Sequence, residues 1–364
     1  MNPSDVHPLL ACPRCGGDFE SSFETTLKCL SCGEFFPIRE GVPSFYDPSV
    51  YWGEEFDLDE MRTINSLAVE KGWREAVRDM VKPKSPERAE YIEGFFRADW
   101  RFLFPVQENW TVLDVGAGWG TLSCALAEVV GEVVALESAF ERAKFIQHRI
   151  EQDAISNLTT IHGTLTRPPL KTGSFDLIAL NGVLEWLGWA DTSRSVPSVQ
   201  VEHLKTCWNL LKPGGWLYVG IENRFGISSW LGAMDHSYLK YTSLMPRMLA
   251  HGCTNLKRKH AYRTYTYSPI GYRRLLTKAR FEEIDFFATL PTYSRPVYYW
   301  PVGNGKALKR VIKILTQEKP NNAKLGWAAK IVDRTPEGLL SVAAPYLVPH
   351  LLIVARKAKD DRID

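Results

Sequence analysis

Residues 111 to 120 read Thr-Val-Leu-Asp-Val-Gly-Ala-Gly-Trp-Gly and hold the strongest fold signal in the chain. Val112–Val115 are mostly β-branched or apolar, which predicts a strand. Three glycines in the next five residues permit a tight turn, and the run from Thr121 to Val130 then has helical character. Such a turn lets a ligand approach the backbone at a helix N-terminus. The stretch therefore predicts a ligand-binding α/β unit.

Strand-like and helix-like segments alternate after this turn. The expected strands are Val133–Leu136, Leu158–Ile161, Phe175–Leu180, Trp216–Ile221, Phe281–Ala288 and Leu351–Ala355. The expected helices are Ala139–Ile150, Ser198–Leu211 and Ser268–Ala279. This alternation predicts an α/β fold, with a Rossmann-like parallel sheet covered by helices on both faces.

The glycine turn also narrows the choice of ligand. A dinucleotide fingerprint, GxGxxG, needs a third glycine where this chain has Thr121, which argues against NAD. The string VLDVGAGWG, followed by Glu137 at the end of the next strand, resembles the first two motifs of class I S-adenosylmethionine (SAM) methyltransferases. Phe175–Ile178 and Leu211–Gly215 agree with later motifs in the same order, so the resemblance covers residues 111 to 221.

The resemblance implies that SAM is the cofactor. It assigns cofactor binding to Asp114, Gly116, Ala117, Gly118, Glu137, Thr164 and Asn181. Glycines leave room for the methionine part of SAM, and the carboxylate of Glu137 offers two acceptor oxygens to the two ribose hydroxyls. Asp114 is expected to accept from backbone donors or, through water, from the ammonium group. Thr164 departs from the acid that many of these enzymes use to bind the adenine amino group.

Four of the seven cysteines form two CxxC motifs, Cys12-Pro-Arg-Cys15 and Cys29-Leu-Ser-Cys32. Two residues between cysteines let both thiolates face one ion, so the motifs together predict a closed, structural zinc site in a zinc ribbon. Leu9–Cys15 and Phe36–Pro43 resemble the Trm112-type zinc modules. Members of that family act as partners of methyltransferases, so the resemblance implies a supporting module fused in cis.

These signals divide the chain into three parts. Residues 1–46 form the predicted Trm112-like ribbon, and residues 47–110 a helical connector with a second helix near Ala89 to Phe104. Residues 111–358 form the predicted methyltransferase domain, with insertions at about 223–267 and 289–349. Apolar residues make up 45% of the chain and charged residues 24%, as in a packed globular protein.

The sequence also bears on location. No apolar run approaches the roughly 20 residues of a membrane-spanning helix. The N-terminus lacks the basic start and apolar region of a secretory signal, and an odd number of cysteines argues against a disulfide framework. We therefore expect a cytoplasmic protein. Its net charge of only +2 predicts neither a nucleic-acid binder nor an acidic-ligand binder.

Two residues are candidate catalytic groups, Glu185 and His236. Glu185 follows the fourth strand in Asn181-Gly-Val-Leu-Glu-Trp186, a position that meets the transferable methyl group at the carboxyl edge of the sheet. The alternative is an exposed acid at a helix start. His236 is a second candidate base, although a lone histidine is more often structural. The absence of an Asn/Asp-Pro-Pro-aromatic string here favours an oxygen nucleophile over a planar nitrogen.

The insertion that begins at Asn223 continues into a strongly basic segment. From His236 to Phe281 there is no Asp or Glu, and the ten basic residues are Lys240, Arg247, Lys257, Arg258, Lys259, Arg263, Arg273, Arg274, Lys278 and Arg280. Tyrosines interleave with them, at Tyr238, Tyr241, Tyr262, Tyr265 and Tyr267. The segment predicts a lid over an anionic acceptor, with a solvated basic face as the alternative.

The second insertion begins with an aromatic, proline-rich segment, Pro291 to Pro301, which suits either stacking against sugar rings or packing under a loop. Lys306 to Leu315 then alternates basic and apolar residues in helical phase. That pattern allows peripheral contact with an anionic membrane, and it also fits a surface helix docked by its apolar side.

Together these features favour a SAM-dependent methyltransferase that O-methylates an anionic small molecule or glycan precursor. A second interpretation is an RNA methyltransferase whose basic lid contacts phosphates. A third is a noncatalytic SAM-binding scaffold.

Overall fold

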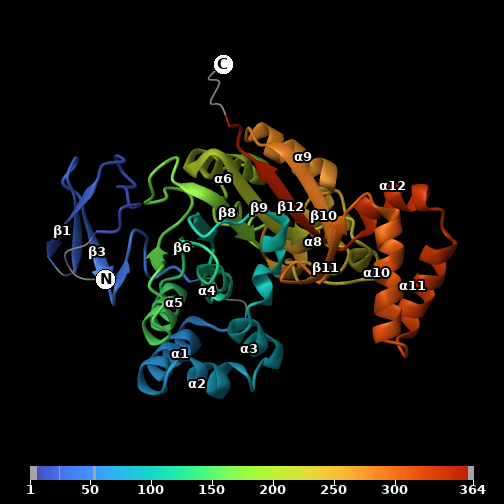
Figure 1. Ribbon diagram of the computed structural model, residues 1–364, viewed down its shortest axis with the longest axis horizontal. Helices are drawn as coiled ribbons and strands as arrows, with labels where there is room; N and C mark the ends of the chain where they lie inside the picture. Colours follow the sequence, from blue (N-terminus) through green and yellow to red (C-terminus); the bar gives the residue numbers. More distant parts are fainter. Residues whose placement is uncertain (1–5, 24, 52–54, 360–364) are drawn as a thin grey trace. The chain divides into compact units, whose positions relative to one another are not determined.

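The computed structural model describes residues 6–23, 25–51 and 55–359 (Figure 1). The chain divides into two compact units. The first comprises Met1–Leu180, Lys205–Leu217 and Lys357–Asp364, and the second comprises Asn181–Leu204 and Tyr218–Arg356.

The main sheet has eight strands in the order β11-β10-β12-β9-β8-β5-β6-β7. Their bounds are β5 Thr111–Val115, β6 Glu132–Glu137, β7 Leu158–His162, β8 Phe175–Asn181, β9 Leu211–Glu222, β10 Glu282–Thr292, β11 Arg295–Pro301 and β12 His350–Arg356. β5 pairs in parallel with β6 and β8, and β6 pairs in parallel with β7. The predicted α/β class is confirmed.

The sheet is mixed, whereas the sequence predicted parallel strands. β10 pairs antiparallel with β11 and with β12. Only residues 293 and 294 separate β10 from β11, and a connection this short can join only antiparallel neighbours. The aromatic segment Pro291 to Pro301, expected to open an insertion, therefore continues the sheet as β11.

The N-terminal module is a four-stranded antiparallel sheet in the order β1-β2-β3-β4. Its strands are β1 Phe19–Phe23, β2 Thr26–Cys29, β3 Phe35–Arg39 and β4 Val42–Pro43. Phe19, Phe36 and Phe45 pack their rings with centroids 5.1 to 5.7 Å apart. This small apolar cluster lies in a module of few residues, which is the situation in which a metal adds most to stability.

The module joins the edge strand β7 within the first unit. Ser44, directly after β4, pairs in parallel with His162, and the backbone N–H of Phe45 donates to the His162 carbonyl at 2.8 Å. Leu10 forms an antiparallel bridge with Leu170. The edge of the sheet at β7 is thus covered by the N-terminal module, which satisfies backbone groups that an open edge would expose.

The connector is helical. Its elements are α1 Leu58–Lys71, α2 Trp73–Ala76, η1 Val77–Val81, α3 Pro86–Glu93 and η2 Phe96–Leu103. Asp57 caps α1 in a capping box with Glu60, and Ser85 caps α3. The single helix expected near Ala89 to Phe104 is instead two elements, because α3 ends at Gly94 and η2 is a 3₁₀ helix.

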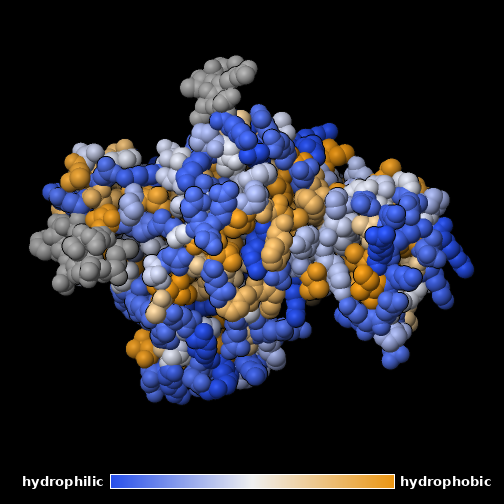
Figure 2. Space-filling view, viewed as in Figure 1, coloured by the Kyte–Doolittle hydropathy of each residue, from blue (hydrophilic) through white to orange (hydrophobic). Residues whose placement is uncertain are grey.

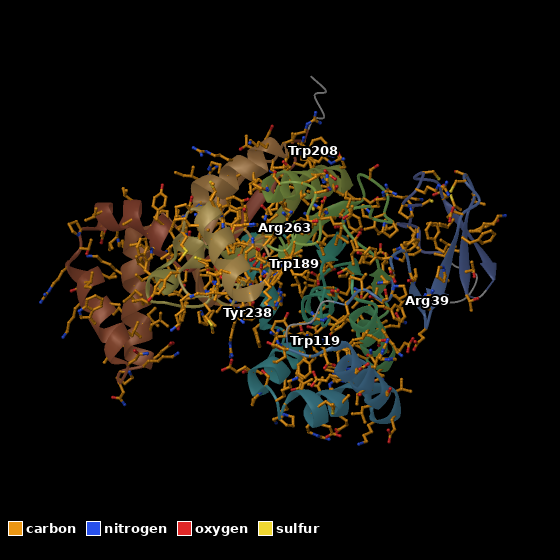
Figure 3. The ribbon with its side chains drawn as sticks, turned by 180° about the vertical axis from the view of Figure 1, so that it is seen from behind. Arg39, Trp119, Trp189, Trp208, Tyr238 and Arg263 are labelled. Atoms are coloured by element: carbon orange, nitrogen blue, oxygen red, sulfur yellow. The ribbon has the colours of Figure 1, made fainter. Side chains whose placement is uncertain are left out.

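The helices beside the parallel strands are α4 Thr121–Ala127 and α5 Phe140–Gln152. α5 packs against β6, β7 and α1. Trp119 of the glycine-rich turn, labelled in Figure 3, lies in a buried cluster with Phe56 and Phe145, which links that turn to the connector helices. The turn is therefore anchored on its apolar side.

The remaining helices are α6 Val196–Leu210, α7 Ile227–Trp230, η3 Thr242–Leu244, α8 Arg247–Arg258, α9 Pro269–Lys278, α10 Gly305–Glu318, α11 Ala323–Arg334 and α12 Glu337–Leu347. α10 packs against both α11 and α12. Figure 2 shows hydrophilic residues mixed with apolar ones over these three helices. Within the part of the chain that the structure describes, no helix is long and apolar enough to cross a membrane.

Candidate functional site

The glycine-rich turn brings bare backbone to the carboxyl end of β5. Gly116, Gly118 and Gly120 have φ values of 65°, 60° and 75°, a region that side-chain-bearing residues rarely adopt. The N–H of Gly116 donates to the Leu136 carbonyl at 2.8 Å. A Cβ built on Gly118 would find no atom nearer than Arg142 Nη1, at 3.8 Å. The turn is therefore fixed at one end and leaves open space at Gly118.

Glu137, the last residue of β6, faces this turn. Its Oε2 accepts from the N–H of Gly118 at 2.7 Å, and its Oε1 accepts from the N–H of Ala139 at 2.9 Å. The residue is only 5% exposed. Oε1 also receives the Ser138 hydroxyl at 3.5 Å, whereas Oε2 keeps a further lone pair, so Glu137 can still accept from a ligand hydroxyl.

Asp114 lies within β5, two residues before the first glycine of the turn. It is 2% exposed, and its Oδ2 accepts from the hydroxyl of Ser123 in α4 at 2.6 Å. Burial raises the pKa of Asp114 to about 6, against the opposing effects of the Ser123 hydrogen bond and the charge of Arg97. Asp114 thus ties β5 to α4, through both the hydroxyl and the backbone of Ser123.

Arg142 is a residue that the sequence analysis did not single out. It lies in the first turn of α5, and its guanidinium carbon is 5.8 Å from the Trp119 ring centroid and 6.0 Å from that of Tyr51. Its Nε is buried without a hydrogen-bond partner among the described residues. Its place five residues after Glu137, on the helix that follows the strand-end acid, is the sequence signal that could have found it. A cation beside the turn can bind an anionic group of a ligand.

The other two predicted cofactor residues lie at strand ends. Thr164 is half-buried in the loop that follows β7. Asn181, the last residue of β8, is 3% exposed. A Cβ on Gly220 would lie 2.4 Å from Asn181 Oδ1, so a glycine at that position of β9 makes room for the amide.

The four clustered cysteines meet at one end of the N-terminal module. Their sulfur atoms all lie within 4.8 Å of one another, with 3.7 Å between Cys12 and Cys32 and 3.5 Å between Cys15 and Cys29. In a tetrahedral site with zinc–sulfur bonds of about 2.3 Å, sulfur atoms are about 3.8 Å apart. The thiols therefore fit a tetrahedral metal ion.

The backbone turns tightly after each CxxC motif. Gly16 and Gly33 follow the two motifs with φ values of 76° and 73°, and their N–H groups donate to the carbonyls of Cys12 and Cys29. The N–H of Cys32 lowers the pKa of the Cys29 thiol to about 6, whereas burial raises the pKa of Cys12 and, against the effect of the Gly17 N–H, hydrogen bonds with neighbouring thiols raise that of Cys15 to about 12. A thiolate is the form that binds metal.

In the second unit, three side chains that can hold protons or metals converge. Glu185 lies in the loop after β8, Glu222 ends β9, and His236 lies between α7 and η3. His236 Nε2 is 3.7 Å from Glu185 Oε1 and 3.4 Å from Glu222 Oε1. The structure thus brings the two predicted catalytic candidates together and corrects the picture of Glu185 as an exposed acid, because it is 0% exposed.

Glu222 is the third member, and the sequence analysis missed it. Burial opposes its ionisation, but the hydrogen bond and attraction of His236 outweigh burial and hold the pKa of Glu222 below its ordinary value. Its position at the end of β9, like that of Glu137 at the end of β6, was the available signal. The Trp186 ring packs edge-on against His236, with centroids 4.8 Å apart.

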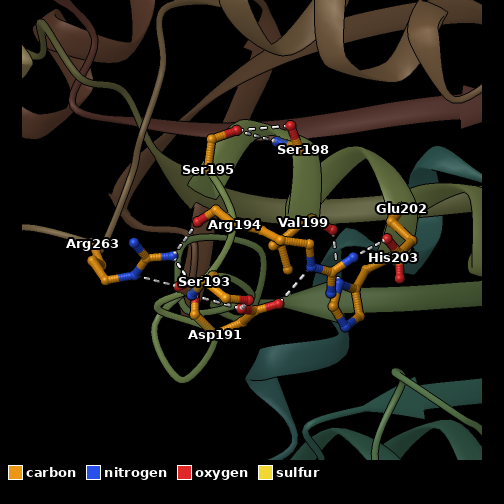
Figure 4. A network of polar contacts seen from close by, with 10 residues as sticks. Asp191, Ser193, Arg194, Ser195, Ser198, Val199, Glu202, His203 and Arg263 are labelled. Carbon is orange, nitrogen blue, oxygen red and sulfur yellow. Dashed lines mark hydrogen bonds and ion pairs between the residues drawn. The ribbon is translucent and has the colours of Figure 1, made fainter.

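Part of the basic segment has a structural role. Arg263 donates through Nε to the Gly188 carbonyl at 2.7 Å, and through Nη2 to the Asp191 and Arg194 carbonyls (Figure 4). Arg273 donates to the Ile284 carbonyl at 2.7 Å. These contacts hold loops of the chain together, so neither residue can be counted as a free anion ligand.

Arg247 differs from these residues in its surroundings. Its guanidinium carbon lies 4.0 Å from the ring centroid of Tyr265, with Tyr262 and Tyr267 at 5.5 and 5.6 Å. Its Nη2 donates to the Thr266 carbonyl, whereas its buried Nη1 has no hydrogen-bond partner among the described residues. The tyrosine rings orient this cation and leave one donor available.

Arg224 adds a second positive charge nearby. Its guanidinium donates to the Ser243 carbonyl at 2.8 Å and to the Met245 carbonyl at 2.9 Å. Burial, together with the nearby Arg247, lowers the pKa of Arg224. Two half-buried guanidinium groups repel each other, and an anion bound between them would offset that repulsion.

Comparison with known proteins agrees with both resemblances. Residues 113–219 match the family described as a methyltransferase domain, and residues 4–41 match the family described as Trm112p-like protein. The chain therefore carries a methyltransferase domain and an N-terminal Trm112-like module, which confirms both predictions.

Among curated relatives, the chain is similar to ubiquinone biosynthesis O-methyltransferases. The protein of Xanthomonas oryzae pv. oryzae is 29% identical over 140 residues, which are 38% of this chain and 54% of that protein. The protein of Albidiferax ferrireducens is 28% identical over 156 residues, 42% of this chain and 56% of that protein. The chain spans about half the length of the curated relatives it matches.

Solved structures with some similarity in backbone fold include a methyltransferase and a complex of a methyltransferase with its activator. Phosphoethanolamine N-methyltransferase 2 of Haemonchus contortus, solved with SAM, has a TM-score of 0.44 at 13% identity, covering 81% of this chain and 60% of that one. The complex of the Haloferax volcanii Trm112 methyltransferase activator with a methyltransferase has a TM-score of 0.40 at 17% identity, covering 81% and 97%.

Proposed function

We propose that this protein transfers a methyl group from SAM to an oxygen atom of an anionic small molecule or glycan precursor. The observation that carries the proposal is the contact of Gly118 N–H with Glu137, which joins an open glycine turn to a strand-end carboxylate. The name that the curated relatives share, an O-methyltransferase, supports oxygen as the acceptor atom.

The residues of the glycine turn fit SAM. Gly116 and Gly118 offer backbone without a side chain to the methionine part, and Ala117 adds only a methyl group. Glu137 would accept from the ribose hydroxyls, with the Ser138 hydroxyl as a competing donor to Oε1. Arg142 suits the methionine carboxylate. Asp114 and Thr164 of the first unit, and Asn181 of the second, are the other residues proposed to contact the cofactor. When bound, SAM supplies an electrophilic methyl group on a sulfonium.

The cluster of Glu185, Glu222 and His236 is proposed to serve the acceptor. SAM would supply the methyl group to the acceptor oxygen and would keep the electron pair of the broken carbon–sulfur bond on sulfur, and a carboxylate or imidazole of the cluster would take the hydroxyl proton. Holding the hydroxyl in line with the methyl group contributes the rest of the rate enhancement through positioning.

Zinc is proposed for the four cysteines. A closed site of four thiolates leaves no position for water or substrate, so its role would be to stabilise the module that covers the β7 edge. Ser44 of the module hydrogen-bonds His162 of β7. Loss of the metal should therefore also lower the stability of the first unit around β7.

The proposed reaction is tested with methyl-labelled SAM and fractionated cell extract. Label recovered as a methyl ether or ester on a phosphate- or carboxylate-bearing small molecule would support the proposal. Label recovered in RNA would favour an RNA methyltransferase instead. Tight SAM binding with no labelled product in any fraction would favour a noncatalytic scaffold.

The anionic part of the proposal rests on Arg224 and Arg247. Inorganic phosphate and pyrophosphate should protect the protein against thermal unfolding, and Arg247→Met should remove most of that protection. Lys257→Gln, which alters an exposed lysine of the same segment, is the matched control and should keep it. Equal protection of the Arg247→Met variant and the wild type would exclude Arg247 as the anion ligand.

A further inference from the structure

Three potential metal ligands converge on one point of the second unit. Glu185, Glu222 and His236 each offer a donor atom, and these three atoms all lie within 4.8 Å of one another. Roughly 3.0 to 3.4 Å separates neighbouring ligand atoms around a cation with bonds of about 2.1 Å. The observed distances of 3.4 and 3.7 Å from His236 Nε2 to the two carboxylates need only small adjustment to reach that range.

The way in which the carboxylates approach His236 separates two interpretations of the cluster. A carboxylate that orients a catalytic histidine binds one ring nitrogen and leaves the other for the substrate. Here both carboxylates approach the same atom, Nε2, at distances beyond the 2.7 to 3.2 Å range of a good hydrogen bond. Donor atoms that converge from a loop, a strand end and an insertion on one point are arranged as ligands around a cation.

The charge of the cluster of Glu185, Glu222 and His236 also favours a bound cation. Two carboxylates and one imidazole carry a net negative charge even when the imidazole is protonated. Glu185 is fully buried, and burying net charge costs several kcal/mol unless it is compensated. The side chains of His236 and Glu222 are 23% and 29% exposed, whereas His236 Nε2 and both oxygens of Glu185 are buried, so the ligand atoms lie beneath partly exposed side chains. A divalent cation would neutralise the carboxylates.

We propose that Glu185, Glu222 and His236 bind one divalent cation. Two oxygens and one imidazole nitrogen suit Mn²⁺, Fe²⁺ or Zn²⁺ better than Ca²⁺ or Mg²⁺, which prefer oxygen ligands throughout. Three protein ligands leave positions open for water or for an acceptor hydroxyl. The role of the cation rests on the proposed function: it would hold the acceptor hydroxyl and lower its pKa, so that the proton passes more easily to the second oxygen of Glu222, the carboxylate oxygen that does not bind the cation.

Binding is tested on the full chain with its cysteine site filled with zinc, as checked by elemental analysis. Titration with Mn²⁺, followed by the loss of the free-ion electron paramagnetic resonance signal, should show one bound Mn²⁺ per chain. Glu222→Gln and His236→Gln should each weaken Mn²⁺ binding by tenfold or more. Glu282→Gln, an exposed acid on β10, is the control and should bind Mn²⁺ as the wild type does.

The two proposals fail separately. No bound Mn²⁺, or equal binding by the wild type and a correctly folded Glu222→Gln variant, would overturn the cation site whatever the methyl-transfer assay shows. Mn²⁺ bound at these three residues, in a protein that methylates no fraction of the extract, would keep the cation site and overturn the proposed function. Circular dichroism of each variant checks that the fold is intact.

Discussion

The backbone N–H of Gly118 donates to Oε2 of Glu137 across 2.7 Å, so the glycine turn after β5 and the end of β6 are held by one direct bond. The second oxygen of the same carboxylate receives the N–H of Ala139, at the start of α5. One buried acid therefore aligns a turn, a strand end and a helix start before any ligand binds. This preorganisation lowers the entropy cost of ligand binding.

We expect Glu137→Ala to weaken SAM binding by about 1–3 kcal/mol, or roughly fivefold to 150-fold, because it leaves the ribose hydroxyls and two backbone donors without their acceptor. Isothermal titration calorimetry measures the change. Glu128→Ala removes an exposed acid after α4 and should leave the affinity unaltered. If both variants bind SAM like the wild type, Glu137 does not belong to the cofactor site.

Elemental analysis should find one zinc per chain bound to the cysteine site, and Cys29→Ser should abolish it. Loss of zinc should also lower the melting temperature, because the metal stabilises a module too small to hold a large core. Cys253→Ser, at a half-buried cysteine outside the cluster, is the control. Zinc-free wild-type protein that melts at the same temperature as the zinc-loaded form would contradict a structural role.

His162 should make stability depend on pH. Burial lowers its pKa to about 4, while its ring contacts the Ser44 hydroxyl at 2.7 Å and the Ser138 carbonyl at 3.2 Å. As pH falls from about 6.5 towards 4, His162 is protonated in the unfolded chain but stays neutral in the folded chain. The free energy of unfolding therefore falls over that pH range by roughly 3 kcal/mol at most.

Asp114 has the opposite effect on the pH dependence of stability. The contribution of His162 must therefore be measured by comparing the wild type with a His162 variant. Its raised pKa of about 6 means that the folded form keeps a proton which the unfolded form releases, and stability falls as pH rises from about 4 to 6. Urea unfolding at pH 7 and pH 4.5 should therefore be compared between the wild type and His162→Gln. The variant should lose less stability on acidification, and equal losses would refute the assignment.

Arg263→Gln should lower the free energy of unfolding by about 1–3 kcal/mol, because its guanidinium serves three carbonyls of the loop from Gly188 to Arg194. Limited proteolysis should cut that loop faster in the variant. Lys257→Gln, with an exposed side chain, should change stability by no more than about 0.5 kcal/mol. Equal stability of the two variants would mean that the carbonyls find other donors.

Much of the fold followed from local sequence pattern. The three glycines of the turn, the acid at the end of β6 and the two CxxC motifs act over a few residues, and their effect depends on backbone geometry that sequence spacing already specifies. The parallel strands β5 to β8 were placed to within one or two residues for the same reason. The split between α3 and η2 was missed, because Gly94 was not recognised as a helix end.

Long-range contacts were decided by the tertiary structure. Glu222 lies 37 residues after Glu185 and 14 before His236, and no periodicity in the sequence says that a strand end, a loop and an insertion will meet. The same holds for Ser44 with His162, and for Arg247 with its three tyrosines. Local preferences choose strands, turns and metal motifs, whereas which side chains share a buried site depends on how whole elements pack, and packing is a property of the entire chain.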